Sequence, residues 1–357
     1  MIRIILAFLT ISLLAASSAM AAPCIAAKDS CTAWINVGPG PDRVMVYRTF
    51  PLETRNEAIS RALIVVHGAP RNADNYFRSA TAAGFLAGAL DDTVIISPRF
   101  ASNSSEGCHD KLEANEINWS CEGWRMGGDV NGNSTLSSYD VIDRILALLS
   151  RRDVFPNLRH VVLAGHSAGG VFVQLYSITN QVHEKLPFAL SYVVSNPSSY
   201  AYFDTTRPRE TDYATSARAP GFVPDPPADS ASAAEGSPYP VFDDAKNCTR
   251  FNDWPYGLEN RTRYTSRIPA EQIVAQSKAR ATSYLLGQLD ILPIPSFAKS
   301  CPAMAEGPSR LARGQAYFNY VREKLGANHS LTVVPLCGHN DRCMFTADVS
   351  LPILFPK

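Results

Sequence analysis

A serine set between two glycines is the pattern in this chain with the clearest chemical meaning. Ser167 lies between Gly165 and Gly169, directly after the apolar run 161–164. A serine hydroxyl is a weak nucleophile, so a reactive one must stand clear of the fold, beside a base and facing donors for an oxyanion. A sharp turn from a strand into a helix does this and leaves no room for side chains two residues either side. We therefore predict a nucleophile elbow that contains Gly165, His166, Ser167 and Gly169.

Two further residues that follow predicted strands would complete a catalytic triad. Asp290 comes after the apolar run 283–286, and His339 comes after the run 331–335. Because functional residues of an open parallel sheet gather beyond the carboxyl ends of its strands, we expect both to lie near Ser167. His339 is the predicted general base, since imidazole titrates near neutrality. Asp290 would hold the imidazole in the correct tautomer.

The choice of the acid has two alternatives. Asp204 lies beyond another predicted strand, and Asp341 is close to His339 in the sequence. The Gly287-x-x-Asp290 pattern after an apolar strand favours Asp290.

Oxyanion stabilisation requires backbone N–H groups beside the serine. The residue after the nucleophile, Ala168, supplies the first predicted donor. The second is expected from the turn that follows His67 and Gly68, and we assign it to Ala69. Pro70 has no N–H and cannot serve. His67 is expected to support this oxyanion loop rather than to react.

The stretches between these residues alternate between strand and helix patterns. Continuous apolar runs are typical of strands buried on both faces, and strands separated by helices form a mainly parallel sheet. The sequence therefore predicts an α/β fold with a central sheet flanked by helices. Predicted strands cover residues 43–50, 62–66, 93–97, 161–165, 190–195, 283–286 and 331–335, and predicted helices cover about 74–90, 138–149, 171–179 and 309–325, with another beginning at Pro269.

Three stretches break this alternation. Residues 24–42 are predicted to form an irregular, disulfide-tied arm. Residues 100–136 form a long polar loop that contains Trp119 and Trp124, and about 197–268 is an insertion over the sheet. We expect the last two to shape the substrate pocket. The tryptophans either face substrate or pack in the core.

The N-terminus has the pattern of a secretory signal peptide. An apolar run at 4–16 is followed by an A-x-A cleavage pattern at 19–21, so we predict removal of residues 1–21 and a single mature domain, 22–357. A lipid on Cys24 is the alternative. No later stretch reaches the roughly 18 uncharged apolar residues of a membrane span. A secreted or periplasmic location is expected.

Export would carry all eight cysteines into an oxidising compartment. An even number is consistent with four disulfides, although eight cysteines allow about 105 connectivities. Proximity in the sequence favours the pairs Cys24–Cys31, Cys108–Cys121, Cys248–Cys301 and Cys337–Cys343.

No metal or cofactor is predicted. The cysteines lack the C-x2-C spacing of a zinc site. Asp129, Asn131, Asn133 and Asp140 partly imitate a calcium loop, but Ser134 stands where an EF-hand needs glycine. The alternative is a polar turn.

Charge excludes one class of partner. Lys plus Arg and Asp plus Glu each number 33, so the formal net charge is zero and no broad positive field attracts an anionic partner, either nucleic acid or an anionic membrane. The oligomeric state is not determined by the sequence.

These motifs together resemble those of the α/β-hydrolase superfamily, in particular its secreted microbial esterase- and lipase-like members. The resemblance rests on His67-Gly68, the Gly165–Gly169 elbow, Gly287-x-x-Asp290 and Gly338-His339, and it spans about residues 60–345. It implies the order Ser, Asp, His for the triad. The break in the strand and helix pattern places the predicted insertion after the sixth strand of the fold.

The resemblance and the residues together predict a serine hydrolase that cleaves a small-molecule or polymeric carboxylic ester through an acyl-enzyme. A peptidase or amidase with the same triad is the first alternative, because nothing in the elbow distinguishes an ester from an amide. A non-catalytic binding module is the second, since a fold does not guarantee its activity.

Overall fold

The computed structural model describes residues 22–105, 107–208, 248–292, 294 and 297–357. The predicted signal peptide and residues 209–247 of the predicted insertion lie outside the described residues.

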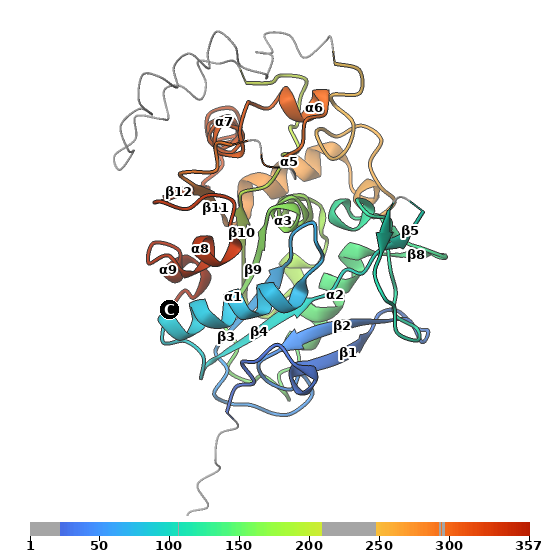
Figure 1. Cartoon of the computed structure of the whole chain (residues 1–357), viewed down its shortest axis with the longest axis vertical. Helices are drawn as coiled ribbons and strands as arrows, with labels where there is room; N and C mark the ends of the chain where they lie inside the picture. Colours follow the sequence, from blue (N-terminus) through green and yellow to red (C-terminus); the bar gives the residue numbers. More distant parts are fainter. Residues whose placement is uncertain (1–21, 106, 209–247, 293, 295–296) are drawn as a thin grey trace, which may run out of the picture.

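An eight-stranded sheet runs through the centre of the molecule in the order β1-β2-β4-β3-β9-β10-β11-β12 (Figure 1). The six strands from β4 to β12 are mutually parallel, and β2 pairs antiparallel with both β1 and β4. The strands are β1 (Thr32–Asn36), β2 (Arg43–Arg48), β3 (Arg61–Val66), β4 (Thr93–Pro98), β9 (His160–His166), β10 (Ala189–Ser195), β11 (Thr282–Gly287) and β12 (Ser330–Val334).

Helices cover both faces of this sheet. Side chains that alternate along each strand enter two separate apolar cores, as a two-residue period requires. In β3, for example, Ile64 faces one core and Leu63 the other. One core is closed by α2 (Ser138–Leu149), α3 (Ala168–Thr179), α5 (Ala270–Ala279) and α7 (Arg310–Leu325), and the other by α1 (Ala73–Leu86), α8 (Asp341–Thr346) and α9 (Leu351–Leu354). The short helix α6 (Cys301–Met304) precedes α7.

The predicted fold class is therefore confirmed, and the predicted strands and helices all occur. Helix α1 ends at Leu86 rather than near residue 90, because Gly88 takes a left-handed φ of 61°. Helix α3 begins at Ala168, immediately after the serine, three residues earlier than predicted.

The prediction of an irregular arm over residues 24–42 was wrong for its central part. Thr32–Asn36 form β1, which pairs along its whole length with β2 at the edge of the sheet. Its side chains do not alternate clearly between apolar and polar, and only Ile35 is fully buried. Trp34 is exposed at this edge, where the guanidinium of Arg43 stacks on its ring.

The long polar loop has more structure than expected. It contains two small hairpins, β5 (Asn103–Ser104) with β6 (Cys108–His109) and β7 (Asp129–Val130) with β8 (Asn133–Ser137), and the short helix η2 (Gly123–Met126). Trp119 and Trp124 are almost completely buried and belong to a core. They pack in the core rather than lining an open pocket.

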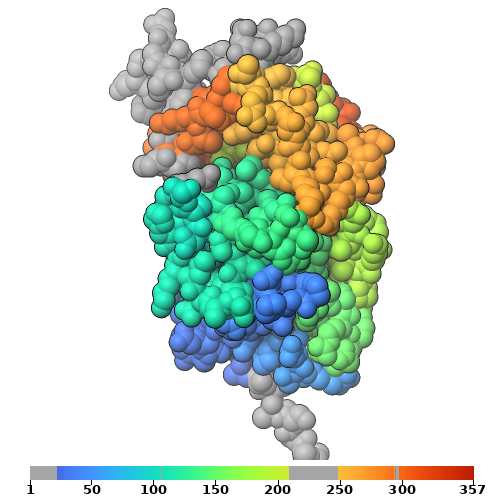
Figure 2. All heavy atoms as spheres, turned by 90° about the vertical axis from the view of Figure 1, so that its right-hand side faces the viewer, coloured from blue at the N-terminus to red at the C-terminus, as the bar shows by residue number. Residues whose placement is uncertain are grey.

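This loop lies beside residues 248–268, the described C-terminal part of the predicted insertion (Figure 2). The indole N–H of Trp254 donates to the carbonyl of Met126 over 2.8 Å, and Arg263 donates to Asp129 over 3.0 Å. Asp140 accepts hydrogen bonds from Ser137 at the start of α2. Two carboxylates of the calcium-like pattern therefore have partners within the protein.

Candidate active site

Ser167 is the single residue between β9 and α3. Its φ of 60° and ψ of −121° lie in a region that residues with a side chain rarely adopt. Such a conformation costs roughly 1–3 kcal/mol and persists only when its surroundings hold it. Here the Ser167 N–H donates to the carbonyl of Ser195 on β10, and its carbonyl accepts from Val171 in α3.

The glycines of the elbow allow three elements to approach each other closely. A Cβ on Gly165 would lie 2.1 Å from the Gly169 oxygen, and a Cβ on Gly169 would lie 2.2 Å from the Val66 oxygen. A Cβ on Gly170 would lie 2.6 Å from the carbonyl of Ser195. Any side chain at these positions would push α3 away from β3 and β10.

The structure brings Ser167, His339 and Asp290 into one hydrogen-bonded chain. Ser167 Oγ lies 2.9 Å from His339 Nε2, and His339 Nδ1 lies 2.7 Å from Asp290 Oδ2. Because a carboxylate accepts only, Nδ1 carries the proton and Nε2 is the acceptor for the serine hydroxyl. The His339 side chain is 10% exposed, whereas the Asp290 carboxyl is 1% exposed. The Asp290 carboxyl is therefore shielded from water, whereas the His339 imidazole is partly accessible.

Asp290 and His339 lie close together because they follow neighbouring strands. β11 ends three residues before Asp290, and β12, its parallel neighbour, ends five residues before His339. The Leu289 N–H donates to the carbonyl of Cys337 and ties the two loops together. Leu336, with a φ of 57°, turns the chain back toward the sheet.

Neither alternative acid contacts the base. Asp341 accepts hydrogen bonds from Asn75 and Ser79 of α1. Asp204 accepts from Thr206 and pairs with Lys324.

A buried histidine lies against His339. His166 is within 4.6 Å of His339, measured between ring centroids, and its Nδ1 lies 3.0 Å from the Tyr76 hydroxyl. Burial, with added repulsion from His339 and Arg310, lowers the pKa of His166 well below its ordinary value. His166 is thus neutral and adds no charge beside the base.

The loop that is predicted to supply the second oxyanion donor adjoins the elbow. A Cβ on Gly68 would lie 3.6 Å from the Ser167 Cβ and 2.7 Å from the Tyr76 hydroxyl. The Gly68 carbonyl accepts from His67 Nδ1 over 2.9 Å and from the Arg71 N–H over 3.0 Å. Since the Gly68–Ala69 peptide is trans, the Ala69 N–H must point the opposite way from that carbonyl. The other expected donor, Ala168, is the first residue of α3, and N–H groups in a first helical turn have no partner within the helix.

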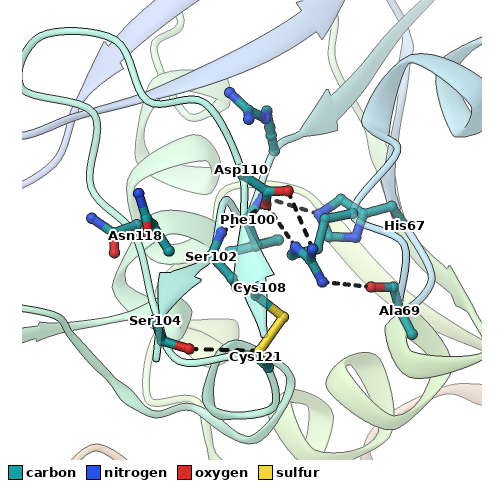
Figure 3. A network of polar contacts seen from close by, with 12 residues as sticks. His67, Ala69, Phe100, Ser102, Ser104, Cys108, Asp110, Asn118 and Cys121 are labelled. Atoms are coloured by element: carbon teal, nitrogen blue, oxygen red, sulfur yellow. Dashed lines mark hydrogen bonds and ion pairs between the residues drawn. A yellow bond between two sulfur atoms is a disulfide. The ribbon is translucent and has the colours of Figure 1, made fainter. Parts of the chain in front are cut away.

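His67 holds this loop through a fixed tautomer. The Phe100 N–H donates to His67 Nε2 over 2.9 Å (Figure 3). The proton is therefore on Nδ1, which donates to the Gly68 carbonyl. The ring is completely buried, and its centroid lies 4.6 Å from that of Trp124. Burial lowers the pKa of His67 to about 4. The imidazole is neutral near pH 7 and joins the Gly68 carbonyl to the Phe100 N–H.

An ion pair anchors the far end of the same loop. Arg71 Nε lies 2.6 Å from Asp110 Oδ2, and Arg71 Nη1 donates to the Ala69 carbonyl over 2.9 Å. Although burial opposes it, hydrogen bonds from Arg71 and the Ser102 N–H hold the pKa of Asp110 below its ordinary value. Figure 3 shows Asp110 beside His67 in one polar network, with the Cys108–Cys121 disulfide below them.

The structure contains the four cysteine pairs that sequence proximity favoured: Cys24–Cys31, Cys108–Cys121, Cys248–Cys301 and Cys337–Cys343. The last pair encloses His339. Within its short loop, the Asn340 side chain accepts from the Cys343 N–H and begins α8 directly after the base.

Sequence reasoning gave no role to Tyr76, Arg71, Asp110 or Arg310. Tyr76 and Arg71 stand in the stretch that follows His67, and their spacing from it carried no chemical signal. Arg310 begins a helix 20 residues after Asp290, and only the folded structure shows that the two side chains meet.

The fold and the elbow together define an α/β hydrolase. The family model described as the alpha/beta hydrolase family matches residues 63–349, and the chain belongs to that family. No curated protein sequence matches the chain.

Solved structures show the same fold. The poly(3-hydroxybutyrate) depolymerase LpqC from Bordetella parapertussis is 19% identical, with a TM-score of 0.57 over 91% of this chain and 90% of that one. Poly(aspartic acid) hydrolase-1 from Sphingomonas sp. KT-1 is 20% identical, with a TM-score of 0.55 over 88% of this chain and 95% of that one.

No helix among the described residues has the length and apolar character that crossing a membrane requires. Those residues also hold no group of three or more side chains suited to a metal ion.

Proposed function

We propose that this protein is a serine hydrolase that cleaves a carboxylic ester through an acyl-enzyme intermediate. Ser167 is the nucleophile, His339 the general base and acid, and Asp290 the residue that orients the imidazole. The observation that carries the proposal is the hydrogen-bonded chain from Ser167 Oγ through His339 to Asp290. Membership of the hydrolase family supports it.

The reaction follows from these positions. Ser167 Oγ attacks the acyl carbon while its proton passes to His339 Nε2, and the carbonyl oxygen becomes an oxyanion. The N–H groups of Ala168 and Ala69 would stabilise that charge. When the intermediate collapses, the alkoxide leaves with the proton from Nε2. Water then repeats the sequence on the acyl-enzyme and releases the acid, so no cofactor is required.

Export is part of the proposal. The signal-like N-terminus and four disulfides support a secreted or periplasmic enzyme whose single mature domain is 22–357. The substrate is a small or polymeric ester.

A fluorophosphonate probe with mass mapping tests the nucleophile. We expect labelling of Ser167 in the wild type and none in Ser167→Ala, together with a loss of esterase activity of roughly 10⁶-fold. Ser266→Ala, a matched change at an exposed serine, is expected to behave as the wild type. Labelling at another residue would refute the proposal.

A panel of p-nitrophenyl esters and peptidyl anilides tests the bond that is cleaved. We expect turnover of the esters. A higher kcat/KM for the anilides would assign the same triad to a peptidase or amidase.

A further inference from the structure

A buried arginine lies behind the acid of the proposed triad. Arg310 is the first residue of α7, and its side chain is completely buried. Its Nη1 lies 3.5 Å from Asp290 Oδ1, the oxygen that does not bind His339. The backbones are also joined, because the Leu311 N–H donates to the Asp290 carbonyl over 3.2 Å.

Among the residues that the structure describes, Asp290 is the negative group that faces Arg310. His166 and Arg313 also face the guanidinium, but the former is neutral and the latter is positive. Arg313 donates to the backbone carbonyls of Gly307 and Ser198. The Phe297 ring centroid lies 5.3 Å from the central carbon of Arg310.

Within the described part of the chain, Asp290 has few ionisable neighbours. His339 binds one carboxyl oxygen and Arg310 faces the other, and Tyr200 is the other titratable side chain that its charge influences. Burial raises the pKa of Tyr200 well above its ordinary value, so that side chain is neutral. An ionised carboxylate shielded from water at this site is costly unless it is paired.

We propose that Arg310 is a positioning residue of the active site, which supplies the counter-charge to the buried Asp290 carboxylate and turns its Oδ2 toward His339. The proposal rests on the triad proposed above. Arg310 touches neither substrate nor Ser167 in this role and acts through Asp290 alone. A fixed positive charge also opposes proton uptake by the coupled Asp290–His339 pair, because it favours the more negative state of that pair.

The pH dependence of kcat/KM for an ester tests the charge effect. In Arg310→Gln we expect the midpoint of the acidic limb to move up by about one pH unit, and kcat to fall by roughly tenfold or more. In Arg310→Lys, which retains the charge, the midpoint is expected to stay within about 0.3 units of the wild type. Arg322→Met removes an exposed charge from the same helix and is the control, with an unchanged profile.

An acidic limb of Arg310→Gln that coincides with that of the wild type would overturn the proposal, as would an equal displacement in Arg310→Lys. A purely structural arginine would lower stability in both variants without separating their pH profiles.

Stability provides a second test that does not require activity. Each of Arg310→Gln and Asp290→Asn leaves a buried charge without its partner, whereas the double variant removes both charges. In urea unfolding we expect the double variant to be more stable than the sum of the two single effects allows. If Arg310→Gln does not fold, adding Asp290→Asn is expected to restore folding. Additive effects, or no rescue, would overturn the pairing even if Ser167 proves to be the nucleophile. Coupling in a chain that lacks esterase activity would instead refute only the proposed function.

Discussion

Replacing His67 by leucine is expected to disable the oxyanion loop while leaving the triad in place. The substitution removes the donor to the Gly68 carbonyl and the acceptor for the Phe100 N–H. The Gly68–Ala69 peptide then retains only the Arg71 N–H to fix its orientation. None of these hydrogen bonds involves Ser167, His339 or Asp290.

The kinetic effect follows from the loss of one oxyanion donor. Removing such a donor costs about 2.7–4 kcal/mol of transition-state stabilisation, which corresponds to a fall in kcat of roughly 10²–10³-fold. Since the Ala69 N–H would be misaligned rather than deleted, we expect a fall of about 10²-fold. KM should change little, because the oxyanion forms only after substrate binds.

His67 also makes the free energy of unfolding depend on pH. The pKa of His67 is about 4 in the folded protein, against about 6.5 for an unfolded histidine. The folded state binds fewer protons between these values, so the stabilisation is complete above about pH 6.5 and is lost as the pH falls toward 4. From pH 7 to pH 4 this loss is about 3 kcal/mol.

Asp143 acts with the opposite sign in nearly the same range. Burial raises the pKa of its carboxyl to about 6, although it accepts hydrogen bonds from Tyr176 and Tyr264. Its protonated form is favoured in the folded state, so its contribution to stability is lost as the pH rises from about 4 to 6. The effect of His67 must therefore be taken from the difference between the variant and the wild type.

Urea unfolding near pH 7 and near pH 4 measures the effect on stability. The kcat for a p-nitrophenyl ester at neutral pH measures the effect on catalysis. His109→Leu, at an exposed histidine, is the matched control and is expected to change neither. A folded His67→Leu enzyme with kcat within about twofold of the wild type would refute the assigned role of His67 in orienting the Ala69 N–H.

Two further predictions concern the elbow and the loop of the base. Gly169→Ala is expected to lower both Tm and activity, because its Cβ would lie 2.2 Å from the Val66 oxygen, whereas Gly40→Ala, which meets nothing within 4 Å, should leave both unchanged; equal Tm values in the two variants would contradict this. Reduction of Cys337–Cys343, or its replacement by two serines, is expected to lower kcat before the protein unfolds, while loss of Cys24–Cys31 leaves kcat unchanged. Full activity with Cys337–Cys343 shown by mass spectrometry to be reduced would contradict the second prediction.

The parts of the site that follow local rules were predictable from the sequence. The elbow requires glycines at fixed offsets from Ser167, and each candidate triad residue follows an apolar strand at the same sheet edge. The parallel strands themselves are continuous apolar runs, since both of their faces are buried. These signals need only the sequence near each residue.

The parts that depend on distant contacts were not predictable. β1 owes its conformation to β2, because its own side chains alternate poorly. Arg310 acquires its significance from Asp290, and Asp110 from Arg71. The sequence separation within each pair matches no motif, so only the folded structure reveals the contact.

The order of the strands determines when a competent enzyme exists during folding. Ser167 follows β9, an interior strand, whereas Asp290 and His339 follow β11 and β12, the last two strands on one side of the sheet. A folding intermediate that has formed the sheet only as far as β10 would possess the strained serine and the oxyanion loop without an acid or a base. Recovery of esterase activity on refolding would therefore report the docking of the last two strands, and would lag behind the burial of the central core.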